Sequence, residues 1–255
     1  MPILIKSPAD IARMRVSGGV VAAVHRAMAE MIEPGITTAE LDMEARRIIG
    51  QAGGSPSFLG YHGYPGAICA SINEEVVHGI PGDRKLKDGD IISIDVGVYL
   101  DGFHGDAAAT YAVGTIEPRL VELIEAAQRA FEIGVERAVV GKRVGDISAA
   151  IQQTIESAGY GVVRGYGGHG VGRRMHEDPS VPNYGTEGTG ARLQPGMTLA
   201  IEPMLTLGSA EVRELEDGWT VVTVDGLPTS HYEHSVLITH GEPELLTQLV
   251  KEMVY

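Results

Sequence analysis

The sequence predicts an α+β protein with two similar halves, about residues 1–113 and 114–255, each with helices packed on an antiparallel sheet. Two observations predict this fold. The order helix, helix, strands occurs twice along the 255 residues, and glycines and acids recur at a displacement of 106 and then 107 residues. No segment rich in proline and serine separates the halves. We therefore expect a single domain in which the two pseudo-symmetric halves enclose a central cleft.

The first half is expected to open with two capped helices. Ser7 is a typical N-cap before Pro8, and that helix should run to about Ile32. Thr37-Thr38-Ala39-Glu40 is a capping box that begins a second helix, which should end near Gly53-Gly54. Strands and glycine-rich loops are expected to fill the rest of this half, from Ser57 to Val113.

The second half repeats this order. Glu117-Pro118 should begin a helix that continues to about Val140, and a fourth helix should run from about Asp146 to Ser157 and end at Gly159. The positions that match between the halves are Gly35 with Gly141, Glu40-Leu41 with Asp146-Ile147, Ala52-Gly53 with Ala158-Gly159, His62-Gly63 with His169-Gly170, Gly89 with Gly196, and Ile94-Asp95 with Ile201-Glu202. Both halves are therefore expected to give carboxylates to the cleft.

A hairpin is predicted over residues 91–111, with Asp101-Gly102 as its two-residue turn. In that register Gly97 pairs with Asp106, and Asp95 lies diagonally from Asp106 on the same face. The opposite face is apolar and should join the core. The simpler alternative is that both acids face solvent on a half-exposed hairpin.

Two further acids adjoin apolar strands. Glu202 follows Leu199-Ala200-Ile201, and Glu233 precedes Ser235-Val236-Leu237-Ile238. Four buried acids in one cleft need a compensating cation. Together with His169 they form an oxygen-rich set that suits two divalent ions better than a structural zinc.

Two histidines occur in the loop Gly-Gly-His169-Gly-Val-Gly-Arg-Arg-Met-His176-Glu-Asp-Pro. Flanking glycines allow close approach of the backbone, which a buried structural histidine does not need. A spacing of seven residues fits neither one helix face nor one strand face. We therefore expect different roles for His169 and His176, one as a ligand and one as an acid, base or hydrogen-bond donor.

The composition narrows the class of protein. With 44% hydrophobic and 21% charged residues the chain is typical of soluble domains, and its net charge of −14 disfavours non-specific binding of nucleic acid. The single cysteine, Cys69, excludes an internal disulfide. No apolar run reaches the length of a membrane span, about 18 residues, and no signal peptide is recognisable, so we expect a cytoplasmic protein.

Several motifs together resemble type I methionine aminopeptidases. They are Tyr-His-Gly-Tyr at 61–64, Val-His-Gly-Ile-Pro at 77–81, Asp-Gly-Phe-His-Gly-Asp at 101–106, the loop from His169 to His176, and Tyr-Glu-His at 232–234. The resemblance covers nearly the whole chain and implies the pita-bread fold. Type II enzymes carry a large insertion where this chain has about 25 residues, between His176 and Glu202, and the short start resembles the bacterial form without an N-terminal extension.

The resemblance implies a reaction and a set of ligands. Asp95 would hold one metal, His169 and Glu202 the other, and Asp106 and Glu233 would bridge both. A water between the metals would attack the carbonyl of an N-terminal methionine that precedes a small residue. Glu202 would carry the proton. The metals could be cobalt, manganese, iron or zinc.

Other residues have roles by the same resemblance. His78 and His176 would position the scissile amide and donate hydrogen bonds. Six residues occupy the positions of the pocket for the methionine side chain: Phe58, Tyr61, Tyr64, Cys69, Met175 and Trp219. The chain departs from the family at two of them, with Phe58 where several bacterial members have cysteine and Met175 where many have phenylalanine. We interpret the two as a compensating exchange.

The expected partner is the N-terminal methionine of nascent polypeptides, with transient contact to the ribosome and no membrane or specific nucleic acid. A monomer is expected from the family. The main rival is an Xaa-Pro aminopeptidase or dipeptidase of the same fold, which generally has an extra N-terminal domain. A non-catalytic module that binds peptides or ribosomes is the second rival, although known relatives of that kind have lost metal ligands.

Overall fold

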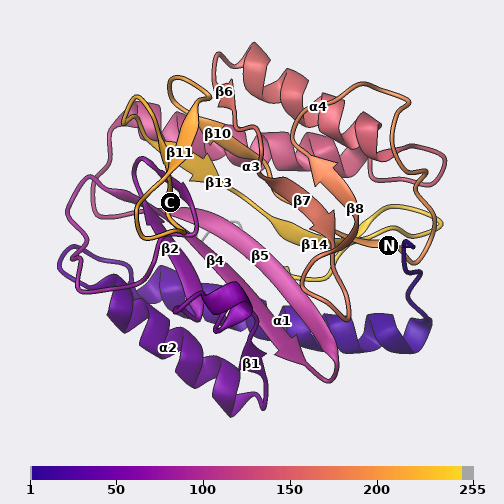
Figure 1. The fold of residues 1–255 in the computed structure, drawn as a ribbon, viewed down its shortest axis with the longest axis horizontal. Coiled ribbons are helices and arrows are strands. Elements are labelled where there is room, and N and C mark those ends of the chain that lie inside the picture. Colours follow the sequence, from indigo (N-terminus) through magenta and orange to yellow (C-terminus); the bar gives the residue numbers. More distant parts are fainter. Residues whose placement is uncertain (1, 249–255) are drawn as a thin grey trace.

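Two pairs of helices lie on the outside of the molecule and cover strands that run between them (Figure 1). The computed structural model describes residues 2–248. The first pair is α1 (Pro8–Met31) with α2 (Thr38–Gln51), and the second pair is α3 (Pro118–Glu136) with α4 (Val144–Ser157). None of these helices in residues 2–248 combines the length and the apolar character that a membrane span requires. The order helix, helix, strands thus occurs twice, as predicted.

The first two helices begin where the sequence places them. Ser7 caps α1 and forms a capping box with Asp10, and Thr37 does the same for α2 with Glu40. In both boxes the side-chain oxygen accepts the N3 backbone N–H and the acid accepts the N-cap N–H, which satisfies two otherwise free donors.

The limits of the other two helices differ from the prediction. Helix α3 ends at Glu136 rather than near Val140, because Arg137 and Ala138 donate to the carbonyls of Gly134 and Val135 in a tighter final turn. Helix α4 begins at Val144, two residues early. Asp146 is its third residue, where the carboxylate accepts the Arg143 N–H at 2.8 Å.

The sheet of the first half carries the predicted hairpin. Strands β4 (Ile91–Leu100) and β5 (Phe103–Ala112) pair antiparallel with Leu100 opposite Phe103 and Gly97 opposite Asp106, so the predicted turn and register are confirmed. Strands β1 (Ser55–Pro56) and β2 (Ile68–Ile72) also pair with β4. Helix α1 packs against β4 and β5.

The second half has a five-stranded sheet in the order β15-β14-β9-β7-β8 and a three-stranded sheet in the order β13-β10-β6. A third sheet, β11-β12-β3, joins the two halves. The remaining bounds are β3 Glu75–Val77, β6 Gly161–Val162, β7 Gly167–Gly170, β8 Glu177–Pro182, β9 Thr198–Ile201, β10 Met204–Thr206, β11 Val212–Glu214, β12 Val221–Thr223, β13 Thr229–His231, β14 His234–Leu237 and β15 Glu244–Leu245, with a 3₁₀ turn η1 at Tyr61–Gly63.

Matching positions of the two halves share backbone geometry. Gly89 and Gly196 have φ of 92° and 86°, and each comes two residues before an inner strand of its sheet. Such angles favour glycine, which explains why the residue recurs. The isolated bridge between Thr37 and Lys85 likewise has a counterpart between Arg143 and Arg192. The match fails for His62, which lies in the exposed turn η1 whereas His169 lies in β7.

A seam of hydrogen bonds joins the halves, between β5 and the segment 231–235. Ala108 and Glu233 exchange backbone hydrogen bonds of 2.8 and 3.4 Å. Ser235 Oγ accepts the Asp106 N–H at 3.1 Å and donates to the Asp106 carbonyl at 3.0 Å. Thr110 Oγ1 makes the same pair of contacts with the backbone of His231, both at 3.0 Å. The seam therefore brings acids from the two halves together.

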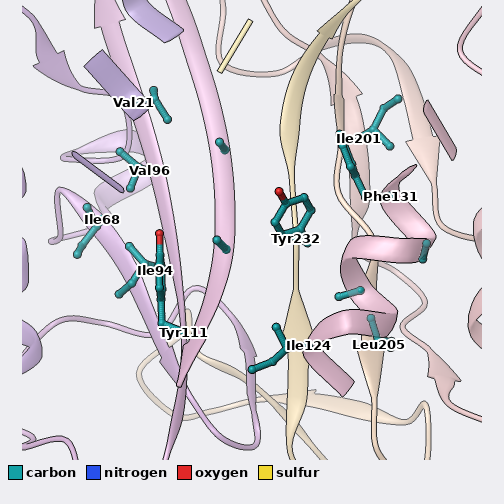
Figure 2. Close-up of a cluster of buried hydrophobic side chains, with 14 of the residues drawn as sticks. Val21, Ile68, Ile94, Val96, Tyr111, Ile124, Phe131, Ile201, Leu205 and Tyr232 are labelled. Carbon is teal, nitrogen blue, oxygen red and sulfur yellow. The ribbon is translucent and has the colours of Figure 1, made fainter. Parts of the chain in front are cut away.

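The hydrophobic core continues across the seam. Figure 2 shows Ile94, Val96 and Tyr111 on the side of β4 and β5, and Ile124 and Phe131 of α3 on the other side. These side chains are almost completely buried. Burial on this scale holds both sheets rigid behind the acids, since each large apolar side chain contributes about 1.5–3 kcal/mol.

Candidate metal centre and its cavity

Four carboxylates meet at the seam. Asp95 lies on β4 and Asp106 on β5, on the same face of the hairpin. Glu202 comes directly after β9, and Glu233 lies between β13 and β14. Asp95, Asp106 and Glu233 form one group in which one oxygen of each residue lies within 4.8 Å of the other two, and Asp106 and Glu233 are buried. The alternative of two solvent-facing acids on a half-exposed hairpin is wrong.

His169 joins these acids from β7. Its Nδ1 lies 2.9 Å from the carbonyl of Gly170, so this nitrogen must carry the proton and Nε2 must present its lone pair. Nε2 is 3.6 Å from Glu202 Oε1 and 3.7 Å from Asp106 Oδ2, beyond hydrogen-bond distance. A lone pair and two carboxylates that face one another without a proton between them fit a shared cation.

Unpartnered atoms test whether a metal fits here. Asp95 Oδ1, Asp106 Oδ1 and Glu233 Oε1 are buried and have no hydrogen-bond partner within the described chain. Buried polar atoms are normally paired, and a divalent ion would satisfy all three. The donor set of carboxylates and imidazole fits manganese, iron, cobalt or zinc.

The electrostatics agree with this fit. Burial raises the pKa of Asp95 to about 7. It also raises the pKa values of Asp106, Glu202 and Glu233, and the charge of neighbouring acids raises them further. Burial lowers the pKa of His169 to about 3, so the ring is neutral and able to ligate at neutral pH. A bound cation would favour the ionised carboxylates.

One cavity of about 260 Å³ opens beside these acids. All thirteen residues predicted for the site line it, and they come from both halves: Phe58, Tyr61, Tyr64, Cys69, His78, Asp95, Asp106, His169, Met175, His176, Glu202, Trp219 and Glu233. The fold therefore brings together predicted site residues that lie up to 175 positions apart in the chain.

The apolar end of the cavity is a separate small cluster. Phe58, Tyr64, Cys69 and Met175 are buried in it, with Tyr61, Ile80 and Trp219 packed around them. Gly97, opposite Asp106 on the hairpin, leaves space for this cluster, since a Cβ there would lie 2.9 Å from Phe58 Cε1. Burial raises the pKa of Cys69 well above its usual value, so its thiol stays protonated.

Two neutral histidines stand at the polar end. Tyr61 Oη lies 2.8 Å from His176 Nδ1, and the His176 ring lies 4.2 Å from the His169 ring. His78 makes edge contacts with Tyr166 and Trp219, and its φ of 60° is unusual for a side chain of this size. Burial lowers the pKa values of both His78 and His176, so each can donate a hydrogen bond as a neutral imidazole.

A buried ion pair supports the loop that carries Met175 and His176. Lys6 Nζ lies 2.6 Å from Glu177 Oε2, with both side chains 4% exposed. Glu177 Oε1 also accepts the Arg174 N–H at 3.1 Å. Loss of one partner would leave a buried charge alone, which is strongly destabilising. This pair ties the segment before α1 to the cavity wall.

Some lining residues were not predicted. The cavity wall is completed by Val77, Gly165, Tyr166, Gly167 and Met204. His231 is not a lining residue, but its ring faces Glu202. Val77 directly precedes His78, and His231 lies two residues before Glu233, so the motifs pointed to their neighbourhood. The direction of these side chains depends on contacts between the two halves, and the sequence pattern does not predict those contacts.

Comparison with known proteins agrees with this geometry. Residues 12–240 match the model of metallopeptidase family M24. Methionine aminopeptidase 1 of Bacillus subtilis is 50% identical over 97% of this chain and all of its own length. The chain belongs to family M24, among its methionine aminopeptidases.

Other members of family M24 support the assignment. Methionine aminopeptidase of Escherichia coli is 43% identical over 97% of this chain and 94% of its own. The crystal structure of methionine aminopeptidase from Thermotoga maritima has a TM-score of 0.95 at 47% identity and covers 97% of this chain. Prolidase from Pyrococcus furiosus shares the fold, with a TM-score of 0.78 at 23% identity, and the chain spans 66% of it. The pita-bread fold is thus confirmed.

Proposed function

We propose that this protein removes the N-terminal methionine of nascent proteins and peptides whose second residue is small. The observation that carries the proposal is one cavity in which an apolar cluster adjoins four buried acids and His169. The methionine aminopeptidases of Bacillus subtilis and Escherichia coli are 50% and 43% identical to it over almost their whole length. The Xaa-Pro enzymes are not favoured, because their likeness extends to the fold alone.

In this proposal five side chains hold two divalent ions. Asp95 and Asp106 of the first half and His169, Glu202 and Glu233 of the second would hold these ions. The ions, when bound, supply Lewis acidity and lower the pKa of water at the scissile carbonyl. Manganese, iron, cobalt and zinc all suit these donors.

The chain itself orients the substrate. The methionine side chain enters the apolar cluster, where a soft thioether contacts Tyr64, Trp219 and Met175. This places the first peptide bond between the acids and the two neutral histidines. Tyr61 fixes the ring of His176, whose Nε2–H can then donate to the carbonyl oxygen, and His78 donates from the opposite wall. Glu202 carries the proton to the leaving amine.

We further propose that Phe58 and Met175 compensate each other in the pocket. Phe58 is 9% exposed and Met175 2%, and both belong to the same cluster. An added ring at one wall is thus offset by a slimmer side chain at another. The double variant Phe58→Cys with Met175→Phe should keep the preference for methionine over norleucine, whereas each single variant should weaken it. Unchanged selectivity in both single variants would contradict the exchange.

The whole chain is proposed as one catalytic domain of two halves that divide near residue 113. It would act in the cytoplasm as a monomer on chains emerging from the ribosome, with only transient contact to the ribosome. The acidic net charge of −14 disfavours non-specific binding of nucleic acid.

The function is tested by release of free methionine from Met-Ala-Ser and Met-Leu-Ser peptides. Chelator-treated protein should be inactive, and added manganese or cobalt should restore cleavage of the alanine peptide alone. Cleavage of both peptides would contradict the preference for a small second residue. No cleavage with any metal, while circular dichroism shows an intact fold, would favour a non-catalytic binding module.

A further inference from the structure

A second histidine faces the acid cluster in addition to His169. His231 ends β13 and is only 2% exposed. Neither the ligand set proposed above nor the cavity wall uses it. Its backbone is held in place by Thr110 Oγ1, which accepts the His231 N–H and donates to the His231 carbonyl. The ring is therefore fixed beside the acids by the seam between the halves.

The nitrogen Nε2 of His231 lies 3.6 Å from Glu202 Oε2 and 3.9 Å from Glu233 Oε2. It has no hydrogen-bond partner among residues 2–248. Hydrogen bonds of this kind span about 2.7–3.2 Å, so these separations are too long. Two ligands bound about 2.0–2.2 Å from one ion are roughly 3–4 Å apart when the angle between them is wide. The observed separations fit that arrangement.

His169 provides an internal reference for this geometry. Its Nε2 lies 3.6 and 3.7 Å from two carboxylates, and one of them is also Glu202. Glu202 therefore has an imidazole nitrogen 3.6 Å from each of its two oxygens. Glu202, His231 and Glu233 form a group whose ligand atoms lie within 4.8 Å of one another, as Asp95, Asp106 and Glu233 do.

We propose that His231 is a further metal ligand that binds through Nε2, together with Glu202 and Glu233. The inference rests on the proposed metal centre and adds a nitrogen donor to it. Imidazole suits iron, cobalt and zinc, whereas manganese prefers oxygen ligands. The second imidazole should therefore shift the affinity of the centre toward cobalt and zinc relative to manganese.

The proposal is tested by proton NMR of the cobalt-loaded protein in water, with the histidines labelled with nitrogen-15. Each ligating imidazole places its remaining ring N–H next to the paramagnetic ion and gives one strongly shifted, exchangeable resonance. Wild type should show two. His169→Gln should lose one of them and His231→Gln the other. Titration calorimetry should show cobalt affinity reduced at least about tenfold in His231→Gln, with a smaller change for manganese.

His25→Gln is the matched control, because His25 is a buried histidine whose two ring nitrogens already contact Tyr111 and Ala107. It should keep both shifted resonances and the wild-type affinity. A single resonance in wild type, lost in His169→Gln and kept in His231→Gln, would overturn the proposal and leave His231 as a hydrogen-bond donor to Glu202. No shifted resonance at all would overturn the metal centre itself. The number of strongly shifted resonances in wild type tests the proposal even if His231→Gln does not fold.

Discussion

The two halves of the molecule share a backbone plan but give different chemistry to the centre. The first half contributes Asp95 and Asp106 from one hairpin, and therefore only oxygen. The second half contributes Glu202 and Glu233 together with both imidazoles that face them. Ile94-Asp95 and Ile201-Glu202 still match in sequence, whereas His62, the counterpart of His169, lies in an exposed turn. The shared backbone plan places Asp95 and Glu202 at matching positions. The two halves nevertheless differ in the donor atoms that they supply to the proposed centre.

The largest loss of activity is expected from a substitution at Asp106, the acid of the first half that faces His169 of the second half. Asp106→Asn keeps the size but removes a charge that the ions of the proposed centre would need, so methionine release from Met-Ala-Ser should fall at least about 10³-fold. Asp101→Asn, at the exposed tip of the same hairpin, is the control and should keep full activity. Comparable activity in both variants would show that Asp106 does not contribute to the centre.

The second test concerns His25, a buried histidine of the first half that is not among the proposed ligands. Burial lowers the pKa of His25 to about 4, against about 6.5 in the unfolded chain. Between these values the unfolded state binds more protons, so this histidine favours folding at neutral pH and the contribution is lost as pH falls toward 4. The loss amounts to about 3 kcal/mol.

Urea unfolding of wild type and His25→Gln at pH 7.5 and pH 4.5 measures this effect. The variant should be less stable at pH 7.5, because the hydrogen bonds to Tyr111 and Ala107 are lost or weakened. The difference in unfolding free energy should narrow at pH 4.5. A difference that is the same at both pH values would contradict a neutral, buried His25.

A substitution at Gly97 tests whether the hairpin of the first half forms a wall of the pocket. A Cβ at this position would lie 2.8 Å from Ser57 Cβ and 2.9 Å from Phe58 Cε1. Gly97→Ala should therefore displace Phe58, raise KM for Met-Ala-Ser and lower stability by about 1–3 kcal/mol. Gly50→Ala, in α2 with open space around it, should leave KM unchanged. An unchanged KM in Gly97→Ala would show that Phe58 does not contribute to the methionine pocket.

The smallest expected effect concerns the contact between Tyr61 of the first half and His176 of the second. Tyr61→Phe removes the hydrogen bond to Nδ1 and should lower kcat/KM about five- to tenfold, in line with roughly 1 kcal/mol. The pH profile of kcat/KM should shift as well, since the ring loses its fixed tautomer. Tyr99→Phe, an exposed tyrosine, is the control. An unshifted profile would mean that Tyr61 only fills space.

Local signals in the sequence were sufficient for much of the fold. The capping boxes at Ser7 and Thr37, and the turn at Asp101, involve residues at most three positions apart, so their structure follows from neighbours in the chain. Family resemblance supplied the residues of the cavity. Neither source predicted the direction of the His231 ring, which depends on hydrogen bonds across the seam to Thr110. The end of α3 was missed because no glycine or proline marks it before Gly141.

The seam makes two residues outside the cavity sensitive to mutation. Ser235 and Thr110 do not line the cavity, yet their hydroxyl groups hold the backbones of Asp106 and His231. A random mutagenesis screen for loss of peptidase activity in stably folded protein should therefore recover substitutions at these two hydroxyl residues. Such alleles would be mistaken for distant regulatory sites, although we expect them to act by changing the spacing between Asp106 and His231 in the proposed metal centre.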